Sequence, residues 1–376
     1  MSIYIYTVME RESKAREILL DSISKNETSS KENIIRADTI NFSFHSDRIV
    51  QTDQFGFIRS TPVAAPSKKE MEVLKKQTLK WDKILNNYEE YFSLNFQKLK
   101  KLTREGIPDS LRGAVWKKFS EVATFHVPGL YAKLLADKSG SALECEKTIL
   151  KDLDRTFPSH SHFSQQYGEG QRSLFHVLSS YAKYNQRTGY VQGMGFLTAL
   201  LLIYMDEESA FYCLHSIMKK YDLEGLYLDG FPSLKKRFFV LLNLIKKFLP
   251  KVYDVMQQFE VVPSIYASEW FITMFTRQLD FNVLVRIFDV FFLEGFKVIY
   301  RFSIAFLKLK QHELVRPGNE MSEIMEALRQ ILTGVTVNEV FEVGYKLHLS
   351  RDHIKELEDE YEKVKNDKAN EFIRLL

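Results

Sequence analysis

The sequence of 376 residues contains few residues that interrupt secondary structure or cross-link the chain: 16 glycines, 9 prolines and 2 cysteines. Sparse glycine and proline disfavour a turn-rich all-β fold and favour long helices. Cys145 and Cys213 have no second cysteine near either of them, which argues against a disulfide framework or a zinc cluster. His160 and His162 alternate as metal ligands can, but no Cys, Asp or Glu stands at ligand spacing beside them, so we predict no metal site.

Long apolar runs, a strong charge excess and a phosphate-binding loop are also missing. The longest apolar run, residues 196–205, is too short to cross a bilayer, and residues 1–11 show no signal-peptide pattern. A net charge of +3 without an aromatic-interleaved basic stripe gives no reason to expect nucleic acid binding. No Gly-x-x-x-x-Gly-Lys-Ser/Thr sequence occurs, so no P-loop is expected. We therefore expect a cytoplasmic protein.

What the chain does have is apolar residues at helical spacing. The hydrophobic content of 45% is enough for a large core, and neither strand–helix alternation nor a regular repeat is visible, which predicts an all-α fold. Ser67 and Glu70 form the pattern of a capping box at the start of one helix. Glycine, proline and aspartate signals bound further helices at 207–220, 232–249, 250–259 and 263–276.

The stretch 149–158 places a carboxylate and a guanidinium three residues apart where a helix must stop. In a helix, Asp152 and Arg155 are i,i+3 neighbours that can pair, and Pro158 ends the helix. Arg155 then lies in or near the last turn, where the helix dipole favours a cation. An arginine held at its base and free at its tip suits an anion supplied by another molecule. The alternative is an ordinary surface ion pair, as most isolated Asp-x-x-Arg sequences are.

A second stretch begins at Thr188 and leads into the apolar run. Gln192 precedes Gly193 and Gly195, and these glycines weaken a helix, so they indicate close backbone approach. A neutral amide at the start of a helix that is apolar nearly all round is unusual. The alternative interpretation is a buried glutamine that satisfies neighbouring backbone groups.

A third stretch, Gly106-Ile107-Pro108, ends one helix and starts another that contains Arg112 and Trp116. Trp116 lies on the buried stripe of that helix. Arg112 is either a structural clamp, which we favour, or a contact for a partner.

These motifs, in this order, resemble those of the TBC family, the helical domains that act as GTPase-activating proteins for Rab small GTPases. The Gly-Ile-Pro stretch resembles the family's opening, Ile149-x-x-Asp152-x-x-Arg155 its arginine-finger motif, and Tyr190-x-Gln192 its glutamine-finger motif. Later segments similar to the family's blocks are Gly225–Tyr227, Trp270–Phe271, Arg286–Asp289 and Glu294–Gly295.

The resemblance covers residues 102–345 and sets the expected domain organisation. Before this domain come an N-terminal segment over 1–48, with an amphipathic helix at 9–24 and a polar linker, and a partly extended arm with a helix over 49–101. A charged C-terminal helix over 346–376 follows and either packs on the domain or binds a partner. The role of residues 1–48 stays open among regulation, targeting and tethering.

The sequence departs from the family's pattern in two places. Phe288 stands where the family usually has tryptophan, and Asp280-Phe281 stands where a Leu-Pro-Phe turn is common. Both departures lie in the C-terminal half, so we expect them to alter packing there rather than the finger motifs.

The resemblance implies two helical subdomains and a regulator that is not itself an enzyme. Arg155 would be inserted into the active site of a GTP-bound Rab GTPase, and Gln192 would orient the attacking water. The partner would carry GTP and Mg²⁺, so no cofactor of the chain's own is implied. The supporting residues would be Asp152, which holds Arg155, Tyr190, which shapes the loop around Gln192, and Ile149 and Gly193.

Such a protein would regulate vesicle trafficking and reach endomembranes or the plasma membrane only through its partners. The alternative function is a scaffold of the same fold that binds a Rab protein or an effector without accelerating hydrolysis.

Overall fold

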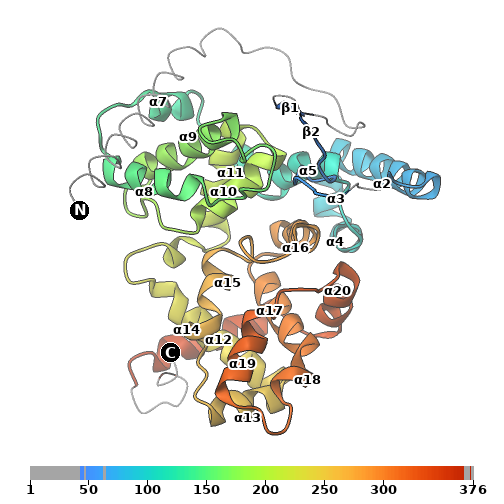
Figure 1. Cartoon of the computed structure of the whole chain (residues 1–376), viewed down its shortest axis with the longest axis vertical. Helices are drawn as coiled ribbons and strands as arrows, with labels where there is room; N and C mark the ends of the chain where they lie inside the picture. Colours follow the sequence, from blue (N-terminus) through green and yellow to red (C-terminus); the bar gives the residue numbers. More distant parts are fainter. Residues whose placement is uncertain (1–42, 46–47, 62–64, 368–372, 374–376) are drawn as a thin grey trace. The chain divides into compact units, whose positions relative to one another are not determined.

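The structure is a computed structural model, and it describes residues 43–45, 48–61, 65–367 and 373. The helix expected over 9–24 and the linker after it lie outside these residues. The chain folds into two compact units, and helices build both of them (Figure 1). The prediction of an all-α fold with two helical parts is therefore confirmed. None of the helices in the described part is both long and apolar enough to cross a bilayer.

The first unit contains the described residues up to Lys83 together with Pro108–His215. The strands β1 and β2 form a short antiparallel pair in which Phe44 lies opposite Ile49. The elements of this unit are β1 (Ser43–His45), β2 (Arg48–Val50), α2 (Lys68–Asn86, as far as Lys83), η1 (Asp109–Leu111), α5 (Arg112–Phe119), α6 (Val122–Phe125), α7 (Leu130–Ala136), α8 (Leu143–Leu153), α9 (Glu169–Tyr184), α10 (Met194–Tyr204) and α11 (Glu207–Lys220, as far as His215).

The core of the first unit is built on α9 and α10. Every residue of α9 from Leu174 to Ala182 is buried, as is every residue of α10 from Leu197 to Leu202. The helices α7 and α8 pack on α9, whereas α5 and α8 contact α10. This central position explains why the run 196–205 contains almost no polar residue, since only Phe196, Ile203 and Tyr204 of α10 are partly exposed to solvent after Gly195.

The second unit contains Ile84–Ile107 and Ser216–Leu376. Its core comes mainly from α12, α16 and α17, which pack on neighbouring helices along most of their length. The complete elements of this unit are α3 (Tyr88–Ser93), α4 (Phe96–Glu105), η2 (Glu224–Leu226), α12 (Pro232–Phe248), α13 (Pro250–Gln258), α14 (Pro263–Tyr266), α15 (Ser268–Ile272), α16 (Phe281–Glu294), α17 (Lys297–Leu309), α18 (Gln311–Leu314), α19 (Met321–Arg329), α20 (Val337–Lys346) and α21 (Arg351–Val364).

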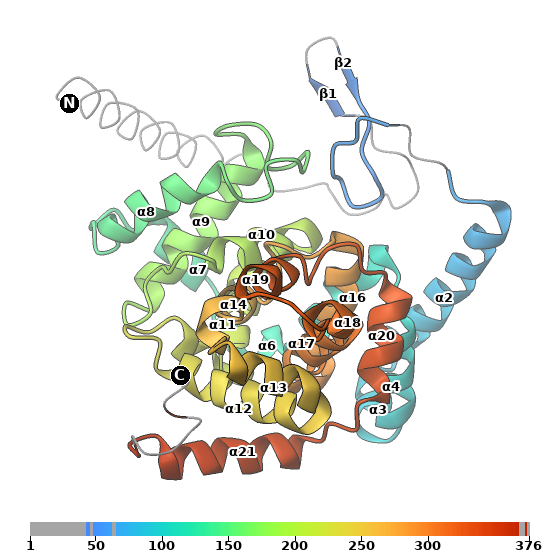
Figure 2. The same ribbon diagram turned by 60° about the horizontal axis from the view of Figure 1, so that its bottom comes forward.

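The C-terminal helix α21 packs on its own domain, which answers a question that the sequence left open. Figure 2 shows α21 running alongside α12. Arg237 of α12 donates a hydrogen bond of 2.7 Å to Glu358, and the rings of Phe239 and Tyr361 lie 5.5 Å apart. The described part of the helix ends at Val364, earlier than the charge pattern suggested.

The helix predicted over 263–276 is wrong as a single element. The chain forms α14 and α15 there, and then Met274 and Phe275 adopt positive φ angles of 50° and 66°. Bulky residues rarely take this left-handed conformation. Met274 and Phe275 are both almost fully buried, so core packing supports a backbone that no local signal predicted.

The departure at residue 280 has a clear local explanation. Asp280 is the N-cap of α16, where its Oδ1 accepts a hydrogen bond of 2.9 Å from the backbone N–H of Asn282. Aspartate is among the best residues for this position. Phe288, the second departure, is fully buried and contacts Phe291 and Phe292.

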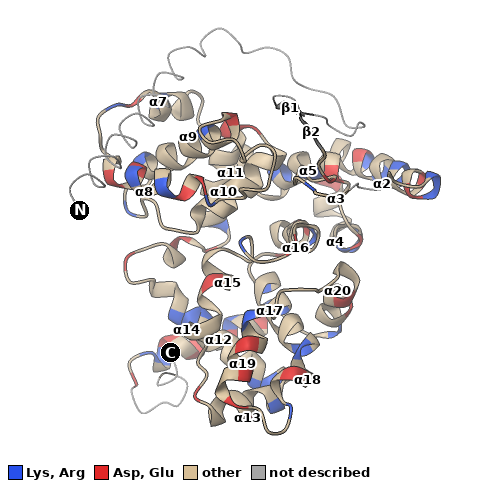
Figure 3. Ribbon diagram, viewed as in Figure 1, with Lys and Arg blue, Asp and Glu red and all other residues tan. Residues whose placement is uncertain are grey.

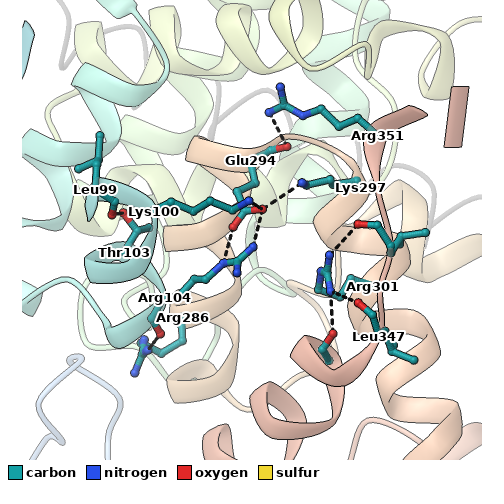
Figure 4. Close-up of polar contacts among 12 residues, drawn as sticks. Leu99, Lys100, Thr103, Arg104, Arg286, Glu294, Lys297, Arg301, Leu347 and Arg351 are labelled. Carbon is teal, nitrogen blue, oxygen red and sulfur yellow. Dashed lines mark hydrogen bonds and ion pairs between the residues drawn. The ribbon is translucent and has the colours of Figure 1, made fainter. Parts of the chain in front are cut away.

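Glu294 joins four segments of the second unit (Figure 4). Its carboxylate accepts hydrogen bonds of 2.7 and 2.9 Å from Arg104 of α4 and pairs with Lys100 at 3.4 Å and Lys297 at 3.1 Å. Its backbone carbonyl accepts a hydrogen bond of 3.0 Å from Arg351, at the start of α21. The side chain of Glu294 is only 2% exposed. The buried carboxylate of Glu294 therefore joins α4 and α17 to the end of α16, and its backbone carbonyl joins the start of α21 to the same point.

Helix α2 combines a capping box with unusual exposure. Ser67 and Glu70 exchange hydrogen bonds of 2.7 and 3.3 Å, as predicted. Trp81 and Ile84 are buried, and Figure 3 shows both signs of charge along the helix. The lysines of α2 therefore belong to a mixed, solvated surface. Four apolar side chains of α2 are nevertheless about half exposed: Met71, Val73, Leu74 and Leu79.

Candidate functional site

Arg155 lies just beyond the end of α8. The helix ends at Leu153, and the backbone N–H of Arg155 donates a hydrogen bond of 3.3 Å to the carbonyl of Asp152. The guanidinium pairs with Oδ1 of Asp152, as the i,i+3 spacing predicted. The Asp152 side chain is 8% exposed, whereas that of Arg155 is 46% exposed. The arginine is thus anchored at one end by a buried carboxylate and open to solvent at the other. Ile149, one helical turn before Asp152, is fully buried and contributes to the core.

Asp152 also holds the segment that contains Gln192. The hydroxyl of Tyr190 donates a hydrogen bond of 2.6 Å to Oδ2 of Asp152. Burial raises the pKa of Tyr190 well above its ordinary value, and the hydrogen bond and charge of Asp152 raise it further, so the hydroxyl stays protonated and can donate. Each oxygen of one carboxylate therefore binds a different segment, and the Arg155 turn is joined to the chain two residues before Gln192.

Gln192 is exposed and makes no hydrogen bond to the residues that the structure describes. The alternative of a buried, satisfied glutamine is therefore wrong. The residue after it, Gly193, has φ of 110° and is the N-cap of α10. A Cβ at Gly195 would lie 3.3 Å from the Tyr190 hydroxyl and 3.4 Å from Oγ1 of Thr156. The two glycines therefore allow the sharp entry into α10 and the close approach of the two loops, as their presence indicated.

We expect Tyr190→Phe to lower the free energy of unfolding by about 2 kcal/mol, because a hydrogen bond to a buried carboxylate is lost. Urea unfolding would measure the change. Tyr184→Phe is the matched control, since the Tyr184 side chain is 41% exposed and its hydroxyl makes no hydrogen bond to the described residues. Equal stability of the two variants would contradict the shared role of Asp152.

Two further residues fix the turn that carries Arg155, and the sequence did not identify them. The Nε2 group of Gln171 donates hydrogen bonds of 3.2 Å to Oδ1 of Asp154 and 3.2 Å to the carbonyl of Phe163. Gln166 donates a hydrogen bond of 3.3 Å to the other oxygen of Asp154. Gln171 is 2% exposed. The only sequence signal for its role was a polar amide at the start of a helix with an apolar face.

His160 lies in the same turn, and both its ring nitrogens are engaged. Nε2 donates a hydrogen bond of 2.8 Å to the carbonyl of Phe55, and Nδ1 accepts one of 3.1 Å from the N–H of His162. This arrangement leaves no ring lone pair for a metal ion. Among the described residues, no group of three or more His, Cys, Asp or Glu side chains has the geometry of a metal site.

Arg112 and Trp116 lie apart from Gln192. Both contact Tyr204, which lies at the end of α10 farther from Gln192. The centre of the Tyr204 ring lies 5.7 Å from the Arg112 guanidinium and 4.9 Å from the centre of the Trp116 ring. The length of α10 separates them from Gln192 by about 15 Å. Arg112 is 5% exposed and pairs with Asp109, and these are the contacts of a structural clamp.

A hollow of about 760 Å³ lies in the second unit, among α4, α16 and α20. Two of its lining cations, Lys100 and Arg104, are already paired with Glu294. Neither Arg155 nor Gln192 lines this hollow.

Comparison with known proteins identifies the family of this fold. The sequence matches the Rab-GTPase-TBC domain over residues 109–315. It is 32% identical over 317 residues to the Rab GTPase-activating protein tbc-11 of Caenorhabditis elegans and to TBC1 domain family member 10A of Mus musculus, and 33% identical over 301 residues to mouse Carabin. These alignments cover 82%, 81% and 77% of the chain, but only 34%, 63% and 66% of the relatives.

Solved structures show the same fold. The Chlamydomonas flagellar RabGAP TBC domain superposes with a TM-score of 0.60 at 25% identity, over 78% of this chain and 99% of that domain. The Ypt/Rab-GAP domain of Gyp1p gives a TM-score of 0.59 at 19% identity, over 77% of this chain and 99% of that domain. Fold and sequence agree, and the chain belongs to the Rab-GTPase-TBC domain family.

Proposed function

We propose that this chain accelerates GTP hydrolysis by a Rab-type small GTPase, to which it supplies Arg155 and Gln192 in trans. The observation that carries the proposal is that Asp152 connects the segments of two exposed side chains, Arg155 and Gln192. One oxygen of Asp152 pairs with Arg155, and the other accepts a hydrogen bond from Tyr190, two residues before Gln192. The names of the relatives, which include a Rab GTPase-activating protein, favour the same activity.

The chemistry of GTP hydrolysis suits an inserted arginine. Negative charge in the transition state spreads over the transferring phosphoryl group and the leaving oxygen. The Arg155 guanidinium is permanently charged, and its planar fork matches phosphate oxygens. Because Asp152 holds only one edge of it, the rest of the fork is open to solvent and available to a partner. Because Asp152 anchors Arg155 before the partner binds, the arginine loses less conformational freedom when the transition state forms.

Gln192 would align the water that attacks the γ-phosphate. Its amide can accept a hydrogen bond from water through the carbonyl and donate one through the NH₂ group. The exposed side chain has no hydrogen-bond partner in the described part of the chain, so both groups remain available. The left-handed Gly193 after it and the buried Tyr190 before it fix its backbone.

The partner would be a Rab protein in the GTP-bound state that brings GTP and Mg²⁺ with it. The chain then acts as a cytoplasmic regulator of vesicle trafficking that reaches membranes through lipid-anchored partners. It would have no independent active site and would need no cofactor of its own.

A panel of GTP-loaded Rab proteins tests the proposal through phosphate release with and without the wild-type chain. Stimulation of some members supports the activity and identifies the substrate. Binding to Rab proteins in their GTP form without stimulation of any would favour the non-catalytic scaffold.

We expect Gln192→Ala to lower the stimulated rate by about 10²-fold, as a misplaced reacting group does. The fold should not change, because the side chain is exposed and contributes no internal hydrogen bond to the described structure. Single-turnover phosphate release measures the rate. Gln186→Ala, an exposed glutamine six residues earlier in the chain, is the matched control and should retain the wild-type rate. A fully active Gln192→Ala variant would remove this residue from the mechanism.

A further inference from the structure

A short hairpin from the arm preceding the domain lies against the turn that carries Arg155. The hairpin comprises residues 51–59, which we name the strap. The N–H of Ile58 donates a hydrogen bond of 2.8 Å to the carbonyl of Ser159, and the N–H of Ser161 donates one of 2.9 Å to the carbonyl of Gly56. Phe57 and His160 thereby form an antiparallel bridge between segments separated by about a hundred residues.

The strap has internal hydrogen bonds that support its shape. Oδ1 of Asp53 accepts hydrogen bonds of 3.0 Å from the N–H groups of Phe55 and Phe57. At the base, the N–H of Arg59 donates a hydrogen bond of 2.9 Å to the carbonyl of Gln51. Because these contacts lie within the hairpin, the strap presents Phe57 to the turn in a fixed orientation.

Gly56 and His160 fit closely where the two segments meet. Gly56 has φ of 93°, and a Cβ there would lie 2.7 Å from Nε2 of His160. The His160 ring bonds to the strap through Nε2 and to its own turn through Nδ1. Burial lowers the pKa of His160 to about 4, so the ring is neutral at pH 7 and keeps one tautomer.

Aromatic rings continue the contact from the strap to both finger segments. The ring of Phe57 lies 5.8 Å from that of Phe157, and Phe157 in turn lies 5.8 Å from Phe196 of α10. Phe157 follows Arg155 by two residues, and Phe196 follows Gln192 by four. Phe157 has φ of 44°, a left-handed conformation that a bulky residue keeps only when its surroundings enforce it. Phe57 is part of those surroundings.

We infer that the strap positions the catalytic turn, with Phe57 as the positioning residue that acts on Arg155 through Phe157. This inference rests on the proposed GTPase-activating function. Phe57 would not touch the nucleotide. Its ring would limit the motion of the turn, and a displacement of about 1 Å in a catalytic group can reduce the rate 10²-fold. The strap should therefore affect the transition state more than the binding of the GTPase.

The test compares Phe57→Ala, Phe57→Leu and the wild-type full chain in steady-state hydrolysis with a responsive Rab protein. We expect Phe57→Ala to lower kcat by about 10-fold with KM within about twofold, and Phe57→Leu to recover most of the rate, because a positional effect appears in kcat. Phe92→Ala, a phenylalanine that is 39% exposed in α3, is the matched control and should keep the wild-type kcat. A Phe57→Ala variant with wild-type kcat, or a loss that appears only in KM, would overturn the inference.

Amide hydrogen exchange separates this inference from the proposed function. In Phe57→Ala, the amide of Ser161 and the peptides covering 155–163 should exchange at least about 10-fold faster, because local opening is easier. If the wild-type chain stimulates no Rab protein, the proposed function fails, while faster exchange still supports strap control of the turn. Unchanged exchange at 155–163 in a folded Phe57→Ala variant would overturn the inference whatever the activity.

Discussion

Arg155→Ala is expected to reduce the stimulation of GTP hydrolysis by about 10³-fold or more, the largest functional effect among single substitutions in this chain. An arginine supplied in trans contributes about 10³–10⁵ to the rate of such reactions. This range corresponds to about 4–7 kcal/mol of transition-state stabilisation. Single-turnover phosphate release with a responsive Rab protein would measure it.

The substitution should leave the fold intact. Arg155 is about half exposed, and among the residues that the structure describes its guanidinium pairs with Asp152 alone. After its removal, Asp152 still accepts the hydrogen bond from Tyr190, and its backbone carbonyl still accepts one of 2.8 Å from Thr156. Circular dichroism and the unfolding midpoint should therefore stay close to those of the wild type.

Two comparison variants sharpen this prediction. Arg155→Lys keeps the charge but loses the planar fork, so it should recover only a small part of the rate. Arg316→Ala removes another exposed arginine that pairs with a carboxylate, Glu323, and should retain full stimulation. Stimulation by Arg155→Ala at the wild-type level would show that the chain accelerates hydrolysis in another way.

Glu294→Ala is expected to be the most destabilising of the proposed substitutions, by about 3 kcal/mol. Removing the carboxylate leaves Lys100, Arg104 and Lys297 close together without their shared anion. This expected loss of stability is at the lower end of the range for breaking a buried ion pair, because the side chains of Lys100 and Arg104 are about a quarter exposed and remain partly hydrated. Urea unfolding followed by circular dichroism would measure the loss.

The pH dependence of stability provides a second measurement at Glu294. Burial alone would raise the pKa of this carboxyl, but the hydrogen bonds from Arg104 and the charges of Arg104, Lys297 and Lys100 outweigh burial and lower it. Because the pKa is lower in the folded state, the stabilisation is complete above about pH 4.5 and is lost as the pH falls through the lowered pKa. The wild type should therefore lose more stability in acid than Glu294→Ala does.

The control for this substitution is Glu342→Ala, which removes an exposed carboxylate paired with the exposed Lys346 in the same unit. We expect no measurable change in the unfolding midpoint, because exposed pairs are screened by water and salt. A loss as large as that of Glu294→Ala would show that burial of the carboxylate is not what matters.

Local sequence signals predicted the elements whose boundaries are set locally. The helix α11 has the predicted bounds, and α12 begins at the predicted Pro232, because proline is favoured in a first helical turn. The pairing of Asp152 with Arg155 was also predictable, since i,i+3 spacing alone brings the two side chains together.

Features that depend on distant contacts were not predictable from local patterns. A partly extended arm before the domain was predicted, but nothing in it indicated His160 as its partner. The carboxylate of Asp152, which pairs with Arg155, binds Tyr190 across 38 residues of sequence, and only the family resemblance related those motifs. The break after Ile272 was missed because buried Met274 and Phe275 hold a conformation that their residue types disfavour.

The position of the strap has a practical consequence for the choice of expression boundaries. The family match begins at residue 109, whereas Phe57 and the Arg104 partner of Glu294 both precede it. A fragment cut at the edges of the match would lose the strap, which we propose supports the Arg155 turn, and both Lys100 and Arg104 of the buried network. The melting temperature of such a fragment should therefore be lower than that of the full chain. If the proposed activity holds, its rates should be lower as well, and Rab proteins that respond weakly would be missed.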